Sequence, residues 1–233
     1  AGRRGFWGTE CDIWETLPAK SGDESTRKFA VSHDDSLYKM CGVKVNITRS
    51  VPNDIEKYRI KKGENAGCYS DQRILFIEDY LDINIKYNMV PVIELKDDRM
   101  TQESLDRLIE ILHQKDLLEK CIIISFYDDL LEKAEKSSEK YNIEPDIYYL
   151  MQKKSFSKFG IKDPIDRIRL SADKKYKGIM PEYSIINNKF VNNSLNNKLL
   201  VGTWVVDDKA CAYSLLRKYD INIITSNKQL FDR

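Results

Sequence analysis

Three short segments combine acids, a histidine and a lysine at the ends of apolar runs. They are Glu10-Cys11-Asp12, His33-Asp34 and Glu94-Leu95-Lys96. Alternate residues of a strand share one face and lie about 7 Å apart. The two acids of the first segment therefore point the same way, as do Glu94 and Lys96. If the segments end parallel strands of one sheet, their side chains converge at a single pocket.

Three converging carboxylates repel one another unless a cation lies between them. Glu10, Asp12 and Glu94 would supply the oxygen ligands that a hard divalent cation, Mg²⁺ or Ca²⁺, prefers. Lys96 would add a positive charge suited to a phosphate oxygen, and His33 can exchange a proton near neutral pH. The pattern favours metal-dependent hydrolysis of a phosphodiester.

Each segment alone has an ordinary alternative. A Glu-x-Asp sequence is commonly a strand end in solvent, and His-Asp-Asp is compatible with a turn or a helix cap. The acid inside Val90-Pro91-Val92-Ile93-Glu94 is less ordinary, because burial within an apolar strand requires a partner. His113, between polar residues of an expected helix, is interpreted as a surface side chain.

The elements that must position these residues form an alternating α/β pattern. Eight runs have strand character: Gly8–Trp14, Lys28–Ser32, Met89–Leu95, Lys120–Ser125, Asp146–Leu150, Lys177–Met180, Leu199–Val206 and Ile221–Thr225. Helices are expected at Ser104–Lys115, Asp128–Tyr141 and Asp207–Tyr219. Alternation of this kind predicts parallel strands joined by right-handed crossovers.

Two segments break the alternation. The connection 15–28 has no apolar periodicity, so the strands on either side of it are expected to form an antiparallel hairpin. That hairpin would return His33 to the side of Glu10 and Asp12. Residues 36–70 lack a helical stripe and are expected to form an insertion in a single domain spanning residues 1–233. Without the return arm of the hairpin, seven strands are left for a barrel.

The bulk composition describes an ordinary soluble globular chain. It has 38 Lys and Arg against 37 Asp and Glu, and a nucleic-acid partner is not expected without a basic excess. The apolar runs are too short to span a bilayer. Five cysteines without a CxxC spacing imply neither a zinc knuckle nor a dense disulfide framework. Cys121 and Cys211 are expected to be buried thiols, and pairing of Cys41 with Cys68 is disfavoured.

Six motifs in order resemble those of the glycerophosphodiester phosphodiesterases over essentially the whole chain. They are Glu10-Cys11-Asp12-Ile13-Trp14, Val31-Ser32-His33-Asp34, Ile93-Glu94-Leu95-Lys96, Ser125-Phe126, Thr203-Trp204-Val205-Val206-Asp207-Asp208 and Ile224-Thr225-Ser226-Asn227. The resemblance implies a TIM (β/α)8 barrel with a small insertion after the His-Asp motif. It also implies hydrolysis of a small-molecule glycerophosphodiester to glycerol 3-phosphate and an alcohol, a reaction of lipid and glycerol metabolism.

Residue by residue, the resemblance assigns Glu10, Asp12 and Glu94 to one divalent metal ion. It assigns His33 to catalysis, as one of two catalytic histidines. Substrate contacts fall to Lys96, at the phosphate, and to Trp204, as an aromatic wall that could equally be barrel core. The sequence leaves open the head group, the choice between Mg²⁺ and Ca²⁺, and the oligomeric state. The high Lys, Asn and Ile content suggests a bacterial protein, either cytoplasmic or associated with the cell envelope.

The opening motif of that family, His-Arg-Gly followed by Pro-Glu-Asn-Thr, is absent here. It would supply the first barrel strand, the second histidine and an arginine for the phosphate. Ala1-Gly2-Arg3-Arg4-Gly5 is similar to the end of the helix that follows this motif. Two expectations compete. The first, which the intact later motifs favour, is that the chain belongs to a longer, ordinary enzyme. The alternative is a catalytically impaired barrel that binds metal or phosphate esters without turnover.

Overall fold

A single curled sheet organises the molecule in the computed structural model, which describes residues 1–63, 66–69, 71–227 and 230. Its eight strands follow the order β2-β1-β3-β4-β5-β6-β7-β8. Their bounds are β1 Gly8–Glu15, β2 Phe29–Val31, β3 Val90–Leu95, β4 Ile122–Ser125, β5 Asp146–Met151, β6 Gly178–Pro181, β7 Leu200–Thr203 and β8 Ile223–Ile224. All eight predicted strands are present, and no end is shifted by more than three residues.

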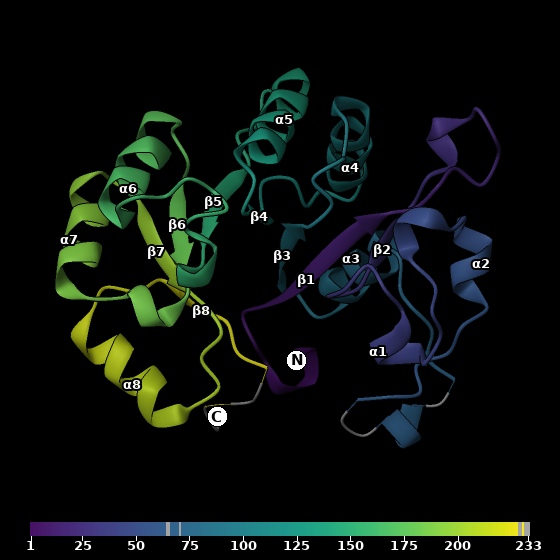
Figure 1. Cartoon of the computed structure of the whole chain (residues 1–233), viewed down its shortest axis with the longest axis horizontal. Helices are drawn as coiled ribbons and strands as arrows, with labels where there is room; N and C mark the ends of the chain where they lie inside the picture. The colour runs from purple at the N-terminus through teal and green to yellow at the C-terminus, as the bar shows by residue number, and fades with distance from the viewer. Residues whose placement is uncertain (64–65, 70, 228–229, 231–233) are drawn as a thin grey trace.

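The strand directions separate a parallel sheet from one antiparallel arm. β2 pairs antiparallel with the end of β1, and each later pair of neighbours is parallel. The predicted hairpin is therefore confirmed. Among the described residues no pairing joins β8 to β1 or β2, so the sheet is a half-barrel that is open on one side (Figure 1). The α/β class is confirmed, while a closed barrel stays a prediction.

Helices line the outside of this curl (Figure 1). They are α3 Ile77–Lys86, α4 Gln102–Gln114, α5 Asp128–Ser138, α6 Pro164–Asp173, α7 Asn188–Asn196 and α8 Lys209–Lys218. The three predicted helices correspond to α4, α5 and α8. α4 begins at a capping box in which Thr101 accepts from the Ser104 amide, and α8 begins at Asp208, which caps the Cys211 amide at 2.7 Å. Helices α3, α6 and α7 were not predicted from the sequence.

The strands alternate between two apolar layers. Their outward side chains, such as Ile13, Ile93 and Ile123, join the helices in the largest buried cluster. The inward side chains form a smaller cluster on the concave face, which includes Val92 and Ile124. Neighbouring residues of a strand point to opposite faces, and both faces are buried here. The strand sequences are therefore continuous apolar runs.

The predicted insertion lies beside β2 (Figure 1). It contains α1 Tyr38–Cys41 and α2 Pro52–Glu56, both short. The insertion has its own cluster of buried side chains, which includes Leu37, Ile47 and Ile55 and extends to Phe76. The organisation of the chain as one domain with an insertion stays a prediction.

The cysteines agree with the sequence in most respects. All five are free thiols, and Cys121 is buried as expected. Cys211 is only half-buried, which corrects its interpretation as a core thiol. It lies in the first turn of α8, where one side of the helix faces solvent. His113 is exposed, as predicted, and stacks on Tyr141 with ring centroids 3.9 Å apart. No described helix is long and apolar enough to cross a membrane.

Candidate metal and phosphate site

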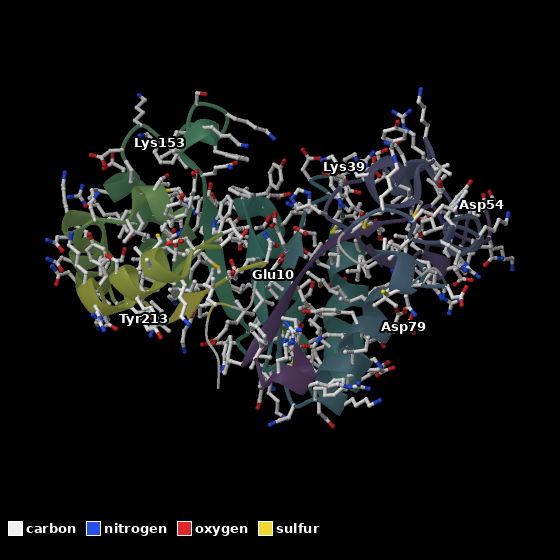
Figure 2. The ribbon with its side chains drawn as sticks, turned by 90° about the horizontal axis from the view of Figure 1, so that it is seen from below. Glu10, Lys39, Asp54, Asp79, Lys153 and Tyr213 are labelled. Carbon is white, nitrogen blue, oxygen red and sulfur yellow. The ribbon has the colours of Figure 1, made fainter. Side chains whose placement is uncertain are left out.

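The register of β1 against β3 brings the three predicted acids together. Asp12 lies directly opposite Glu94, and Glu10 lies opposite Val92. Val92 belongs to the concave cluster, so the acids that share its face project into the curl of the sheet. One carboxylate oxygen from each acid lies within 4.8 Å of the others. Figure 2 shows Glu10 between the insertion, where Asp54 is labelled, and α8, where Tyr213 is labelled.

The strand that carries two of these acids is fixed from its outer side. Thr9 Oγ1 donates to Asn84 Oδ1 at 2.8 Å, and Tyr80 Oη donates to the Thr9 carbonyl at 2.5 Å. Both partners belong to α3, which packs behind β1. These bonds hold Thr9, the residue before Glu10, against α3, so the concave acids project from a supported strand.

Lys96 is the cation of the group. Its Nζ lies 3.0 Å from Asp12 Oδ1 and 3.0 Å from Glu94 Oε1. Burial opposes the charged form of Lys96, but the adjacent carboxylates of Glu94 and Asp12 outweigh it and raise the pKa of the ammonium. Lys96 is therefore protonated at neutral pH. One ammonium among three carboxylates leaves a formal charge of about −2 when all three are ionised.

The pKa values of two of the acids, Glu94 and Glu10, are raised. Burial raises the pKa of Glu94 well above its usual range, and Lys96 counteracts only part of that. The Glu10 side chain keeps an exposed face on the open side of the sheet. Dense packing around its carboxylate and the charge of Asp12 nevertheless raise the pKa of Glu10 to about 8. The raised pKa values of Glu10 and Glu94 favour bound protons that a cation would displace.

The donor set fits a hard divalent metal ion. Three carboxylates offer oxygen ligands only, as Mg²⁺ and Ca²⁺ prefer. Two oxygens bound to one Ca²⁺ at about 2.4 Å lie no more than about 4.8 Å apart, which matches the span of this cluster. The Glu94 Oε1 atom is buried and makes no aligned hydrogen bond, despite its proximity to Lys96. A buried acceptor without an aligned hydrogen bond has capacity for a cation.

The hairpin returns the chain to β1 at the expected place. The Ser32 amide donates to the Asp12 carbonyl at 2.9 Å, so His33 follows immediately beside the acids. Its side chain is 75% exposed, and Nδ1 lies 3.0 Å from Asp34 Oδ1. Asp34 also pairs with Lys39 Nζ at 2.7 Å, and this hydrogen bond lowers the pKa of Asp34. The backbone position is as predicted, while the described polar contact of the ring is with Asp34.

Trp204 lies on the concave face of the sheet. It is half-buried within the inner cluster, and its Nε1 donates to the Met180 carbonyl at 2.8 Å. Its ring meets Phe126 edge-on with centroids 5.8 Å apart. Phe159, for which no role was predicted, stacks on the Phe126 ring with centroids 5.7 Å apart. The run Ser125-Phe126-Tyr127 at the end of β4 was the available indication of this aromatic group.

A surface depression on α8 has none of this chemistry. It is lined by Ala210, Tyr213, Ser214, Arg217 and Lys218. Figure 2 shows Tyr213 well separated from Glu10. The acid cluster at the open face of the curl is therefore the better candidate for a reaction site.

No protein-family model matches the sequence, and a search of curated proteins finds no relative. Solved structures do resemble it. A candidate glycerophosphoryl diester phosphodiesterase from Agrobacterium tumefaciens has a TM-score of 0.77 at 14% identity, over 97% of this chain and 84% of that one. A phosphodiesterase from Oleispira antarctica, solved with the product sn-glycerol-3-phosphate, has a TM-score of 0.74 at 18% identity, over 97% and 83%.

A glycerophosphodiester phosphodiesterase from Parabacteroides distasonis has a TM-score of 0.70 at 16% identity, over 97% of this chain and 82% of that one. The chain thus has the fold of glycerophosphodiester phosphodiesterases. The resemblance expected from the six motifs is confirmed at the level of the fold.

Proposed function

We propose that this protein catalyses the metal-dependent hydrolysis of glycerophosphodiesters to glycerol 3-phosphate and an alcohol. The observation that carries the proposal is the grouping of Glu10, Asp12 and Glu94 around Lys96 on the concave face of the sheet. The similarity in fold to phosphodiesterases, one of which was solved with glycerol 3-phosphate, supports the same reaction class.

The three acids would hold one Mg²⁺ or Ca²⁺ ion. When bound, the ion would neutralise phosphate charge and favour an attacking oxygen. Lys96 keeps its proton at neutral pH because Asp12 and Glu94 stabilise the ammonium. Once a cation satisfies those carboxylates, the ammonium is available to a phosphate oxygen. Binding of the diester and charge neutralisation thus fall to one strand pair, β1 and β3.

His33 is the candidate for proton transfer. The hairpin sets it immediately beyond the residue that bonds the Asp12 backbone. The Asp34 carboxylate accepts a hydrogen bond from Nδ1 of His33. This bond orients the ring and leaves Nε2 to accept or donate a proton. Its solvent-facing position permits exchange of that proton with water.

The test is release of glycerol 3-phosphate from glycerophosphocholine and glycerophosphoinositol by the purified protein. We expect turnover with Mg²⁺ or Ca²⁺ and its loss after chelation. Glu94→Gln should lower kcat by about 100-fold or more, since it removes a metal ligand without changing shape. Glu110→Gln, an exposed acid on α4, is the matched control. Unchanged turnover in Glu94→Gln would overturn the ligand assignment.

A second function, binding of phosphate esters without turnover, is favoured by one observation. The His33 ring is 75% exposed and pairs with Asp34, whereas proton transfer needs it within hydrogen-bond reach of the substrate. Calorimetry separates the two functions. Metal-dependent binding of glycerol 3-phosphate together with undetectable hydrolysis would establish the binding protein. Hydrolysis that His33→Gln lowers by about 100-fold or more would establish the enzyme.

A further inference from the structure

An aromatic group with a fixed cation lies at the rim of the concave face. Phe126 stacks on Phe159 and meets Trp204 edge-on. Tyr127 packs edge-on against Phe159, with centroids 5.4 Å apart. Lys158 completes the group: its Nζ lies 5.1 Å from the Phe159 centroid, 5.4 Å from that of Tyr127 and 3.1 Å from Tyr127 Oη. None of these five side chains is fully buried.

The sheet register connects this rim to the acid cluster. Glu94 on β3 lies directly opposite Ile124 on β4. Phe126 follows two residues later and therefore projects to the same face, about 7 Å further along the strand direction. Ile124, Phe126 and Trp204 all belong to the concave cluster. The rim thus lies beyond the acids, at the carboxyl ends of the strands, where a diester held by its phosphate would extend.

The segment that carries Lys158 and Phe159 is basic. The segment 152–162 contains four lysines and no acid. The two acids that follow Tyr127 are already paired. Asp128 makes a bidentate pair with Arg167, at 2.5 and 2.6 Å, and Asp129 pairs with Lys133 at 2.7 Å. These pairs leave the charge of Lys158 at the rim uncompensated by either neighbouring acid.

We propose that this rim binds the portion of the substrate beyond the reacting phosphate, and that Lys158 selects diesters in which this portion carries a negative charge. The inference rests on the proposed hydrolysis. The partly exposed rings of Phe126 and Phe159 offer apolar surface for the carbon skeleton of the group, and the Lys158 ammonium offers a partner for a second phosphate or a carboxylate.

A quaternary ammonium head group is disfavoured at the same place. Such a group binds proteins chiefly through aromatic faces. Here Lys158 already lies over the faces of Tyr127 and Phe159, so a choline would have to displace it and would be repelled by its charge. The arrangement therefore discriminates against a cationic group by occupancy and by charge together.

The experiment compares kcat/KM for three diesters that share the glycerophosphoryl half. They are glycerophosphocholine, glycerophosphoinositol and glycerophosphoinositol 4-phosphate, whose head groups are cationic, neutral and anionic. We expect the anionic diester to exceed the neutral one by about fivefold, as for an exposed ion pair, and the cationic one to be poorest. Lys158→Glu should reverse the order of the anionic and cationic diesters.

Lys154→Glu is the matched control. It makes the same charge change on an exposed residue of the same segment, and it should preserve the order of the three diesters. Equal effects of the two variants would overturn the assignment to Lys158, as would an unchanged order in Lys158→Glu. Phe159→Ala should lower kcat/KM for all three, because it removes a shared contact. If the wild-type protein hydrolyses none of them, the proposed reaction fails instead.

Discussion

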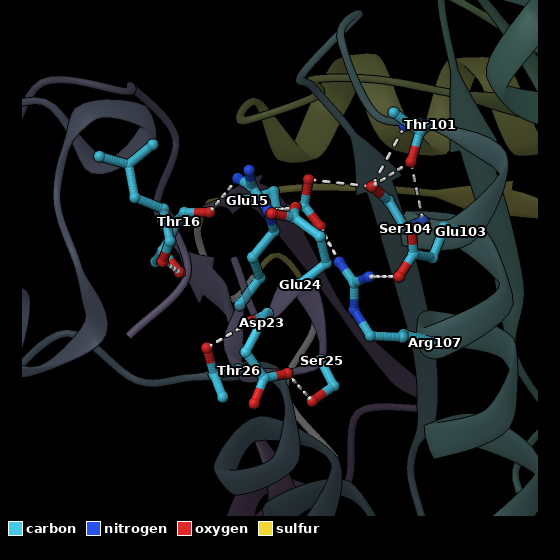
Figure 3. Close-up of polar contacts among 12 residues, drawn as sticks. Glu15, Thr16, Asp23, Glu24, Ser25, Thr26, Thr101, Glu103, Ser104 and Arg107 are labelled. Atoms are coloured by element: carbon cyan, nitrogen blue, oxygen red, sulfur yellow. Dashed lines mark hydrogen bonds and ion pairs between the residues drawn. The ribbon is translucent and has the colours of Figure 1, made fainter. Parts of the chain in front are cut away.

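The two faces of β1 carry acids with opposite partnerships. On the outer face, Glu15 accepts a hydrogen bond from Ser104 Oγ at 2.9 Å and pairs with Arg107 of α4 (Figure 3). On the concave face, Asp12 shares a single lysine with two other acids. Both faces belong to one strand and differ only by the alternation of its side chains.

The number of partners separates a structural acid from a candidate ligand. The carboxylate of Glu15 has a cation and a hydroxyl of its own. Burial still raises its pKa, although Ser104 and Arg107 counteract part of the effect. The concave acids have more negative charge than their single cation can balance. An acid with a complete set of partners stabilises the fold, whereas an incompletely partnered cluster has capacity for a ligand.

The largest expected effect breaks the outer face. Arg107→Ala should reduce the free energy of unfolding by about 3 kcal/mol, because it leaves buried Glu15 without its cation. Urea unfolding followed by circular dichroism measures this. Glu103→Ala removes an exposed partner of the same arginine, 3.7 Å away, and should cost less than about 1 kcal/mol. Equal losses would show that Glu15 does not depend on Arg107.

Neutralising an acid of the concave face should have the opposite signature. Asp12→Asn is expected to weaken Ca²⁺ binding by about 10- to 100-fold, because it removes one ligand charge. The free energy of unfolding without metal should be unchanged or higher, because the substitution relieves the repulsion between Asp12 and the other two acids. Calorimetry measures the Ca²⁺ affinity, and thermal melting measures the stability. Asp79→Asn, at an exposed acid of α3, should change neither, and a Ca²⁺ affinity unaffected by Asp12→Asn would contradict the proposed site.

A pH series should sharpen the contrast. The pKa of Glu10 is raised from 4.5 to about 8, so the folded metal-free protein binds a proton that the unfolded chain has released. Its stability should therefore fall as pH rises from about 5 to 8, by about 1 kcal/mol after allowing for solvent screening of this exposed group. Glu10→Gln should flatten the curve. Denaturant unfolding across this range is the measurement, and an unchanged slope in the variant would refute the shift.

The smallest expected effect concerns the aromatic side of the concave face. Trp204→Phe removes the hydrogen bond from Nε1 to the Met180 carbonyl and should cost about 1 kcal/mol of stability. If Trp204 is plain barrel core, as the sequence allowed, kcat/KM stays the same. If it forms a wall of the substrate pocket, KM rises while kcat is preserved. The two interpretations are thus separated by steady-state kinetics.

Much of the fold could be read from local pattern. The runs around Ile93 and Ile123 are apolar on both faces, as covered parallel strands require, and the loop-like connection before β2 predicted the hairpin. Helices α6 and α7 were missed because polar residues dilute their apolar stripes: aspartate and arginine in Pro164–Asp173, and asparagine in Asn188–Asn196. Only the packing of residues such as Phe190 against the sheet makes their apolar faces apparent.

Residue type and period-two spacing alone place Glu10 with Asp12 and Glu94 with Lys96 on shared strand faces, and this made them candidates for metal and phosphate contacts. Tertiary structure decided how they meet. The register that sets Asp12 opposite Glu94, the ammonium between them, and the placement of Lys158 over two aromatic rings all depend on strand pairing across dozens of residues. Local spacing carries no information about such contacts, because register is set by the packing of whole faces.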